Sequence, residues 1–447
     1  MSSWSIAAGD SFAKKSDLKA PTNPHGVREG FWMVFALLGE ALLYLCFATP
    51  FALDKNFIVL SLMEPPQAQI FGTVMPYYTV FQLLALILGG ALLLLGPHRA
   101  VVTNWAFTTY FAVNLIGIAT LPFLVKSGQP IYWDFALELL RLSSMVILAG
   151  AVLEARKFNP IVLVRCLLIV LCVPLLYLAA SNPTEFLHAR SGRVNGPGLE
   201  ITSTGHVAAL ALLLGICVRL PARYRIPLIG LATVMLLLSG ARIPLALAVI
   251  IIVVKLWRET ERKARRFALV SGVAAITLIL LVLAQSKLIA GGRVGSLTGS
   301  SSSLTAEYAV GRGVAAMTAG ELLAAHPFGY VDSDWSIQDG LVDLGWPSHT
   351  HSNYFQSYLR FGPLALVFWG VLIWRTRKGS RLGSPYTSCL WFVLIGSTLD
   401  YYGFVTKAML VVFMIYELNE AHIRRASDES PLRRIAITNQ ACLAGRA

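Results

Sequence analysis

The sequence predicts an all-α polytopic membrane protein that crosses a bilayer about twelve times. Of its 447 residues, 56% are hydrophobic and only 14% are charged. A water-soluble domain of this length carries roughly 25% charged residues, so these charges are too few to cover a surface exposed to water. The apolar residues also gather in runs of about 20, the length that an α-helix needs to cross a hydrocarbon core of roughly 30 Å.

The predicted spans begin after a polar, basic stretch of residues 1–29 that does not resemble a signal peptide. They cover residues 30–53, 75–96, 101–124, 132–153, 160–180, 203–219, 226–240, 241–257, 267–285, 353–374, 385–404 and 405–420. The seventh and eighth runs are short and must be joined by a tight turn. One continuous helix there would bury Arg242 in the membrane and would contain Pro244.

Lys and Arg residues are distributed unequally over the two faces that this arrangement defines. One face holds 25 of them and the other holds 10. The positive-inside rule therefore places both tails, residues 1–29 and 421–447, in the cytoplasm. The same distribution explains the net charge of +13 without a nucleic-acid partner. All six cysteines lie in spans or in the C-terminal tail, so we expect no structural disulfide.

A large outer loop, residues 286–352, separates spans 1–9 (residues 30–285) from spans 10–12 (residues 353–420). It begins with a Gly/Ser-rich stretch at 295–303, continues with a helical run over 305–325 and ends with acidic and aromatic residues. Mixed polar and aromatic content on the outer face makes this loop a candidate substrate site.

Cations on the basic-poor face are the strongest chemical signal in the sequence. They come from four separate outer segments: Arg190, Arg193, Arg242, Arg312, His349 and His351. Arginine binds phosphate oxygens through a planar fork and stays charged. A single outer arginine is commonly explained by a lipid headgroup or an ion pair. The whole group, however, suits a lipid-linked phosphate or diphosphate.

The sequence after these cations resembles the signature of the O-antigen ligase family. His351-Ser352 is followed, after nine intervening residues, by Gly362-Pro363-Leu364-Ala365, where the family has Gly-x-x-Gly, Thr or Tyr. The fourth position departs from the pattern, although Ala is also small. Residues 326–329, His-Pro-Phe-Gly, resemble an outer HPxxG-like element of the same family, and Arg312 matches the arginine that usually precedes it.

Two further elements extend the resemblance to residues 185–375. The Ser-Gly-Ala-Arg at 239–242 is similar to an arginine-containing turn between two short spans, and 193–197 is similar to an outer loop in which Arg precedes a Gly/Pro/Asn cluster. The Pro-Asn pair that follows this loop in many members is replaced by Gly198-Leu199-Glu200.

The resemblance implies a GT-C-like glycosyltransferase of the bacterial inner membrane that needs neither metal nor cofactor. Its donor would be a glycan on undecaprenyl diphosphate, met at the periplasmic face. A ligase would transfer this glycan to lipid A-core, and an O-antigen or exopolysaccharide polymerase would transfer it to an acceptor glycan. The sequence does not distinguish the two. Membrane lipid and a chain-length regulator are the other candidate partners.

The chemistry assigns roles to the outer cations. His351, with an ordinary pKa near 6.5, can accept the acceptor's proton, and Arg312 is the second candidate catalytic residue. Arg193, Arg242 and Arg312 would hold the departing diphosphate, together with Arg190 and His349. Alternatively, His351 donates a hydrogen bond to phosphate and the base is another group.

Three other interpretations remain open. His349 and His351 could form half of a metal site that Asp332, Asp334, Asp339 or Asp343 completes. A lipid-linked glycan flippase or another transporter would use the charges predicted inside the membrane, which are Glu40, Asp134, Glu138 and Arg141. A non-catalytic assembly subunit would only bind the lipid carrier.

Overall fold

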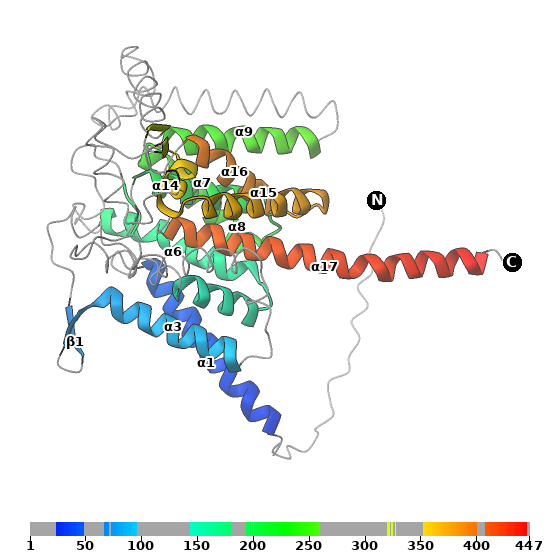
Figure 1. Ribbon diagram of the computed structural model, residues 1–447, viewed down its shortest axis with the longest axis horizontal. Coiled ribbons are helices and arrows are strands. Elements are labelled where there is room, and N and C mark those ends of the chain that lie inside the picture. The colour runs from blue at the N-terminus through cyan, green and yellow to red at the C-terminus, as the bar shows by residue number, and fades with distance from the viewer. Residues whose placement is uncertain are drawn as a thin grey trace, which may run out of the picture.

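The computed structural model describes residues 24–48, 67–70, 73–95, 144–179, 194–197, 199, 201–259, 320–321, 323–324, 327, 352–399 and 407–444. These residues form a bundle of helices, from which the last helix runs out toward the C-terminus (Figure 1). The helices are α1 (Pro24–Ala48), α3 (Tyr77–Leu95), α6 (Pro160–Ala179), α7 (Ile201–Cys217), α8 (Ala222–Ser239), α9 (Arg242–Glu259), α14 (Asn353–Phe361), α15 (Leu364–Arg381), α16 (Thr387–Leu399) and α17 (Lys407–Ala444).

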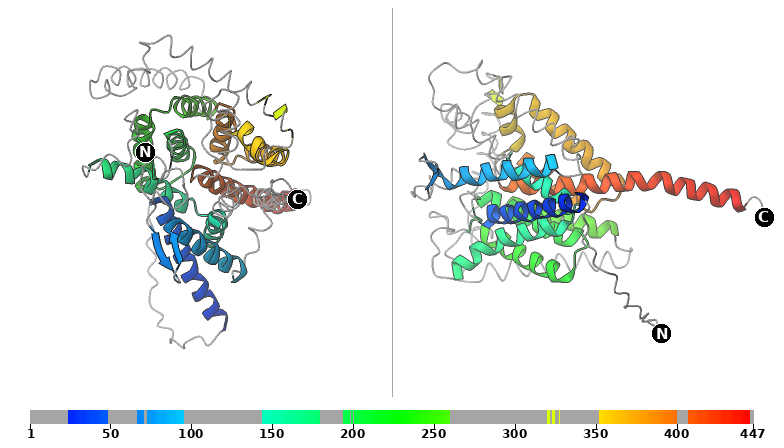
Figure 2. Two further views of the ribbon diagram at one scale, coloured as in Figure 1. Left: turned by 60° about the vertical axis from the view of Figure 1, so that its left-hand side comes forward. Right: turned by 90° about the horizontal axis from the view of Figure 1, so that it is seen from below.

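Two smaller elements complete the described chain. A further helical stretch covers Ser144–Ala155. Strands β1 (Gln67–Ile70) and β2 (Thr73–Pro76) pair antiparallel, with Gln67 opposite Pro76 and Ile70 opposite Thr73. This hairpin leads directly into α3, which packs beside α1 at one edge of the bundle (Figure 2).

Most of the predicted spans that fall on described residues are helical. The helices α1, α3, α6, α7, α8, α9, α16 and α17 each cover one of them, and the end of the predicted span 132–153 lies in the helix Ser144–Ala155. The predicted spans 101–124 and 267–285, and almost all of the outer loop 286–352, lie outside the described residues. Helix α17 also continues to Ala444 through the segment predicted as a cytoplasmic tail.

The prediction of one unbroken helix over 353–374 is wrong. The chain forms α14, then breaks at Gly362, and starts again as α15. Gly362 has φ 62° and ψ −150°, a conformation that side-chain-bearing residues rarely adopt, and Pro363 follows it. Its N–H donates to the Tyr358 carbonyl oxygen at 2.7 Å, which closes the end of α14.

The described helices carry large apolar side chains on their outer surfaces. Ile87, Leu176, Ile226 and Leu366 are between 61% and 71% exposed. Large apolar side chains exposed on several helices suit contact with lipid. Among the described residues, α8 alone is both long and apolar enough to cross a membrane by itself, while several other apolar helices reach 10–17 residues.

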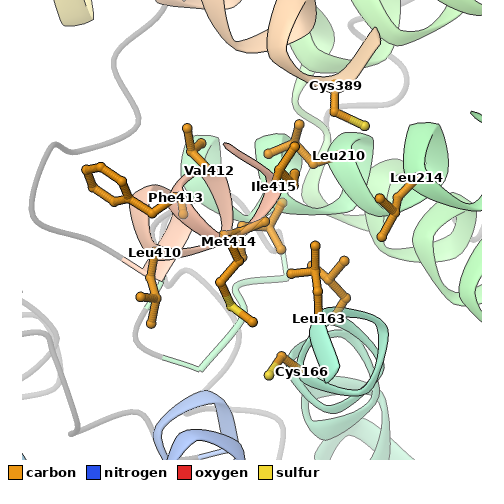
Figure 3. Packing of buried hydrophobic residues seen from close by; sticks show 14 of the residues in the cluster. Leu163, Cys166, Leu210, Leu214, Cys389, Leu410, Val412, Phe413, Met414 and Ile415 are labelled. Carbon is orange, nitrogen blue, oxygen red and sulfur yellow. The ribbon is translucent and has the colours of Figure 1, made fainter. Parts of the chain in front are cut away.

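Helix α7 lies at the centre of the bundle and contacts α6, α8, α9, α16 and α17. Figure 3 shows Met414 of α17 pointing toward Leu163 and Cys166 of α6, and Ile415 of α17 beside Leu210 of α7. Small residues allow the closest crossings, as is common between membrane helices. A Cβ added to Gly205 would lie 2.3 Å from the Ala241 Cβ at the start of α9.

A charge inside the predicted first span is fully paired. Glu40 in α1 is 4% exposed and accepts hydrogen bonds from Arg156 Nε at 2.6 Å and from Tyr44. Arg165 in α6 approaches the same carboxylate at 3.2 Å and also donates to the Tyr224 hydroxyl of α8 at 3.3 Å. Glu40 therefore ties α1 to the chain around α6, whereas Asp134, Glu138 and Arg141 lie outside the described residues.

The close crossing of α7 and α9 gives a test of the packing. Gly205→Ala should destabilise the protein, because overpacking of a core typically costs about 1–3 kcal/mol. The matched control is Gly230→Ala, since a Cβ on Gly230 of α8 would meet nothing within 4 Å. Alanine there should raise stability slightly through its better helix propensity. The measurement is the melting temperature of both variants in detergent, and equal shifts would contradict the crossing.

Candidate functional site

The structure describes one of the six predicted site residues, Arg242. The other five lie outside the described residues: Arg190, Arg193, Arg312, His349 and His351. The described chain nevertheless includes residues adjacent to three of the segments that carry them, namely Val194, Pro327 and Ser352. The contacts of these neighbours show how the segments are joined.

The turn that carries Arg242 is built as the sequence predicts. Helix α8 ends at Ser239, and Gly240 adopts the left-handed conformation with φ 59°, donating its N–H to the Leu237 carbonyl oxygen at 3.0 Å. Arg242 is the first residue of α9, and its side chain is exposed. The guanidinium therefore stands at the positive end of the α9 dipole, where an anion is favoured.

The loop that begins at Val194 packs against this turn. The Val194 N–H donates to the Leu238 carbonyl oxygen of α8 at 3.2 Å. Two residues later, the Gly196 N–H donates to the Thr204 hydroxyl of α7 at 2.8 Å. Val194 and Leu199 are buried, so the loop is fixed on both sides. The segment after Arg193 and the turn at Arg242 thus lie together.

A buried lysine holds the same loop from the opposite side. Lys407 is the first residue of α17 and is completely buried, and its Nζ donates to the Pro197 carbonyl oxygen at 2.7 Å. A buried ammonium is stable only where hydrogen bonds replace its hydration. From the sequence, Lys407 was one more cation of the basic-poor face, and its link to the loop was missed. The position of this lysine directly before a long apolar run is the signal in the sequence that could have indicated a buried, hydrogen-bonded charge.

The start of α14, directly after His351, is attached to α16. The Ser352 hydroxyl donates to the Ser397 carbonyl oxygen at 3.1 Å, and Asn353 Nδ2 donates to the Ser397 hydroxyl at 3.4 Å. The Tyr354 hydroxyl donates to the Leu394 carbonyl oxygen at 2.8 Å. Four polar side chains at this end are buried: Ser352, which caps α14, and Asn353, Gln356 and Ser357 within the helix.

Helix α16 then joins α14 to the rest of the site. A Cβ added to Gly396 would lie 3.4 Å from His206 Nε2 of α7 and 3.6 Å from Leu247 of α9. The His206 ring packs near Phe392, with ring centroids 5.6 Å apart, and its Nδ1 lies 2.8 Å from the Thr202 carbonyl oxygen. Helix α7 is consequently the common support of the Val194 loop, the α8–α9 turn and the α14–α16 pair.

The signature residues after His351 fold into a compact corner. The Tyr358 hydroxyl donates to the Pro327 carbonyl oxygen at 2.8 Å, which joins the His-Pro-Phe-Gly element to α14. Trp369 of α15 donates its indole N–H to the Ser357 hydroxyl at 2.8 Å. Ala365, the departure from the family pattern, is 2% exposed, so a small residue fits the close packing there.

No group of three or more His, Cys, Asp and Glu side chains gathers to hold a metal within the described ranges. The proposed partners of a metal at His349 and His351, which are Asp332, Asp334, Asp339 and Asp343, lie outside those ranges.

The described chain is a helical protein with exposed apolar side chains, in which a turn, a loop and a helix break are joined through helix α7. Residues 227–370 match the family model described as O-antigen ligase, which supports the resemblance that the sequence motifs indicate. Members of this family are membrane proteins, and the match supports a ligase- or polymerase-like function in polysaccharide biosynthesis. No curated protein matches the chain. The matched region includes Arg242, Arg312, His351 and Gly362.

The bond from Lys407 gives a test of how the loop is fixed. Lys407→Met keeps the length of the side chain but removes the donor to Pro197, so residues 194–199 should open more often. Hydrogen exchange of a peptide covering the Leu199 N–H, which donates to Gly196 O at 3.1 Å, should accelerate about tenfold or more. Lys378→Met in α15 is the matched control, and the bond has no such role if both variants exchange alike.

Proposed function

We propose that the protein is a glycosyltransferase of cell-surface polysaccharide biosynthesis that moves a glycan from undecaprenyl diphosphate to an acceptor hydroxyl at the periplasmic face of the bacterial inner membrane. It acts as an O-antigen ligase, with lipid A-core as acceptor, or as an O-antigen or exopolysaccharide polymerase, with a glycan as acceptor. The enzyme is GT-C-like and uses no metal. It has about twelve spans, a large loop over 286–352 and both termini in the cytoplasm.

The observation that carries the proposal is the joining of separate segments on helix α7. The Val194 loop contacts the α8–α9 turn through Leu238, and the α14–α16 pair reaches both α7 and α9 through Gly396. These are the chain segments that continue Arg193, carry Arg242 and continue His351. An anion-binding group assembled from distant parts of a chain requires such a support.

The proposed reaction is a displacement at the anomeric carbon of the donor sugar. The acceptor oxygen forms the new bond to that carbon, and the bond between the carbon and the diphosphate oxygen breaks. The electron pair and the negative charge leave with the lipid diphosphate, where Arg193, Arg242 and Arg312, aided by Arg190 and His349, stabilise them. His351 accepts the proton of the acceptor hydroxyl. No nucleotide is needed, because the donor carries its own leaving group.

The position of Arg242 supports its role as a diphosphate ligand. Its side chain is exposed at the first residue of α9, and the turn before it is closed by the αL conformation of Gly240. A cation at a helix N-terminus adds its charge to that of the helix dipole. The turn is rigid, so this charge does not have to reorganise when the leaving group becomes more negative.

His351→Ala and Arg242→Ala should each lower glycan transfer in proteoliposomes by about 100- to 1000-fold, since each removes a group that acts on the transition state. Both variants should insert and melt like the unaltered protein. Arg377→Ala, an exposed arginine of α15, is the matched control and should transfer normally. Full transfer by either site variant would overturn the assignment.

Deletion of the gene distinguishes the two forms of the proposal. Loss of long chains with one repeat unit left on lipid A-core indicates a polymerase, and loss of all attached glycan indicates a ligase. A change confined to secreted polysaccharide indicates an exopolysaccharide polymerase.

The topology can be tested with a membrane-impermeant maleimide. The described native cysteines are buried or half-buried, so with Cys442 replaced by Ser the background labelling should be low. Ser300→Cys in the outer loop should react in intact spheroplasts. Ser16→Cys in the N-terminal tail should react only after the membrane is permeabilised. Labelling of Ser16→Cys in intact spheroplasts would place the chain in the opposite orientation.

A further inference from the structure

A cavity of about 950 Å³ lies along α9, away from the candidate site. It is lined by the end of α7, by α9 from Leu247 onward, by the segment before α16 and α16 itself, by His422 of α17 and by Pro160 of α6. Arg242 opens α9, whereas the cavity extends along that helix from Leu247 to Arg258. Its volume is within the range of about 300–1000 Å³ that small-molecule sites occupy.

Cations surround one end of this cavity. Arg219 follows α7, and Lys255 and Arg258 lie in the last turns of α9, so three basic side chains line the same end. No acidic residue is among the described residues of the lining. Lys255 Nζ donates to the Cys217 carbonyl oxygen at 3.4 Å, which fixes its position at the end of α7. This end lies on the face that the sequence predicts to be cytoplasmic.

The start of α16 adds a hydroxyl to the same end. Ser384 is 4% exposed and lines the cavity, and its Oγ has no hydrogen-bond partner among the residues that the structure describes. Buried polar groups without a partner are rare in folded proteins and usually meet a ligand or water. The N-terminus of the 13-residue helix α16 follows at Thr387, so its dipole also favours an anion here.

The rest of the cavity is apolar. Leu247 and Ile251 are buried or half-buried in its lining, whereas Ile250, Val254 and Ile395 are 57%, 45% and 42% exposed. The cavity is therefore open along the lipid-facing surface of α9. A small hydrophilic anion would leave this part of the cavity unused, whereas a hydrocarbon chain attached to a phosphate fits both ends.

From this combination we infer that the cavity is a binding site for an anionic phospholipid of the inner leaflet. Its phosphate lies against Arg219, Lys255 and Arg258, with Ser384 Oγ as a hydrogen-bond donor. One acyl chain lies along Leu247, Ile250 and Val254. Basic pockets between helices on this side of a membrane are suited to anionic headgroups. The site is separate from glycan transfer, and only its assignment to the inner leaflet rests on the membrane orientation given under the proposed function.

Native mass spectrometry of the full-length protein in detergent tests the inference. Phosphatidylglycerol should bind about tenfold or more tightly than phosphatidylcholine with the same chains. The double variant Arg219→Ala/Arg258→Ala should weaken phosphatidylglycerol binding by about 10- to 30-fold, because each cation near a headgroup contributes to its attraction. Arg223→Ala is the matched control, as Arg223 lies four residues after Arg219, in the first turn of α8, but does not line the cavity. Equal weakening by the control would overturn the inference.

A second variant and a second ligand separate a lipid from a free phosphate. Ile250→Trp should obstruct the chain-binding part and lower phosphatidylglycerol binding while all cations remain. Because Ile250 is exposed, the variant should keep its melting temperature. Inorganic phosphate at millimolar concentration should displace little lipid. If phosphate displaces it completely and Ile250→Trp binds normally, the cavity is a phosphate site and the lipid inference fails.

Discussion

The hydrogen bond from the Lys407 ammonium to the Pro197 carbonyl oxygen is the contact on which the arrangement of the site depends. In an apolar environment, an irregular loop is stable only when its polar groups are satisfied by the protein. The Val194–Pro197 loop meets this demand with three partners from three helices, which are Leu238, Thr204 and Lys407. The lysine in turn is stable only because the loop supplies an acceptor. The loop and the lysine therefore stabilise each other in the core.

The same constraint explains why glycine and serine mark the joints of the bundle. Gly240 closes α8 with its own N–H, and Ser352 donates its hydroxyl to the Ser397 carbonyl oxygen near the end of α16. Gly205 and Gly396 let α7 approach α9 and α16 without a side chain between them. Small residues thus bring helices together where backbone polar groups end, and the exposed arginine of the α8–α9 turn stands at one of these joints.

Much of the fold was accessible from the sequence because apolar runs and tight turns are local signals. The turn between α8 and α9 followed from the cost of burying Arg242 and from Pro244. The break at Gly362 was missed, since the apolar run continues through it and only the backbone conformation reveals it. The sequence also does not predict that α17 continues beyond residue 420. The residues there are polar, and a polar stretch after the last apolar run is typical of a tail.

The sequence predicts which residue types form the candidate site. Which chain segments lie together can be seen only from contacts in three dimensions. The link of Tyr358 to Pro327 connects residues 31 apart, and that of Lys407 to Pro197 connects residues 210 apart. No periodicity or spacing encodes such pairs. The opposite ends of α9 illustrate the consequence: Arg242 opens the helix beside the Val194 loop, and Lys255 and Arg258 end it beside Ser384. One helix thereby carries basic side chains at both ends.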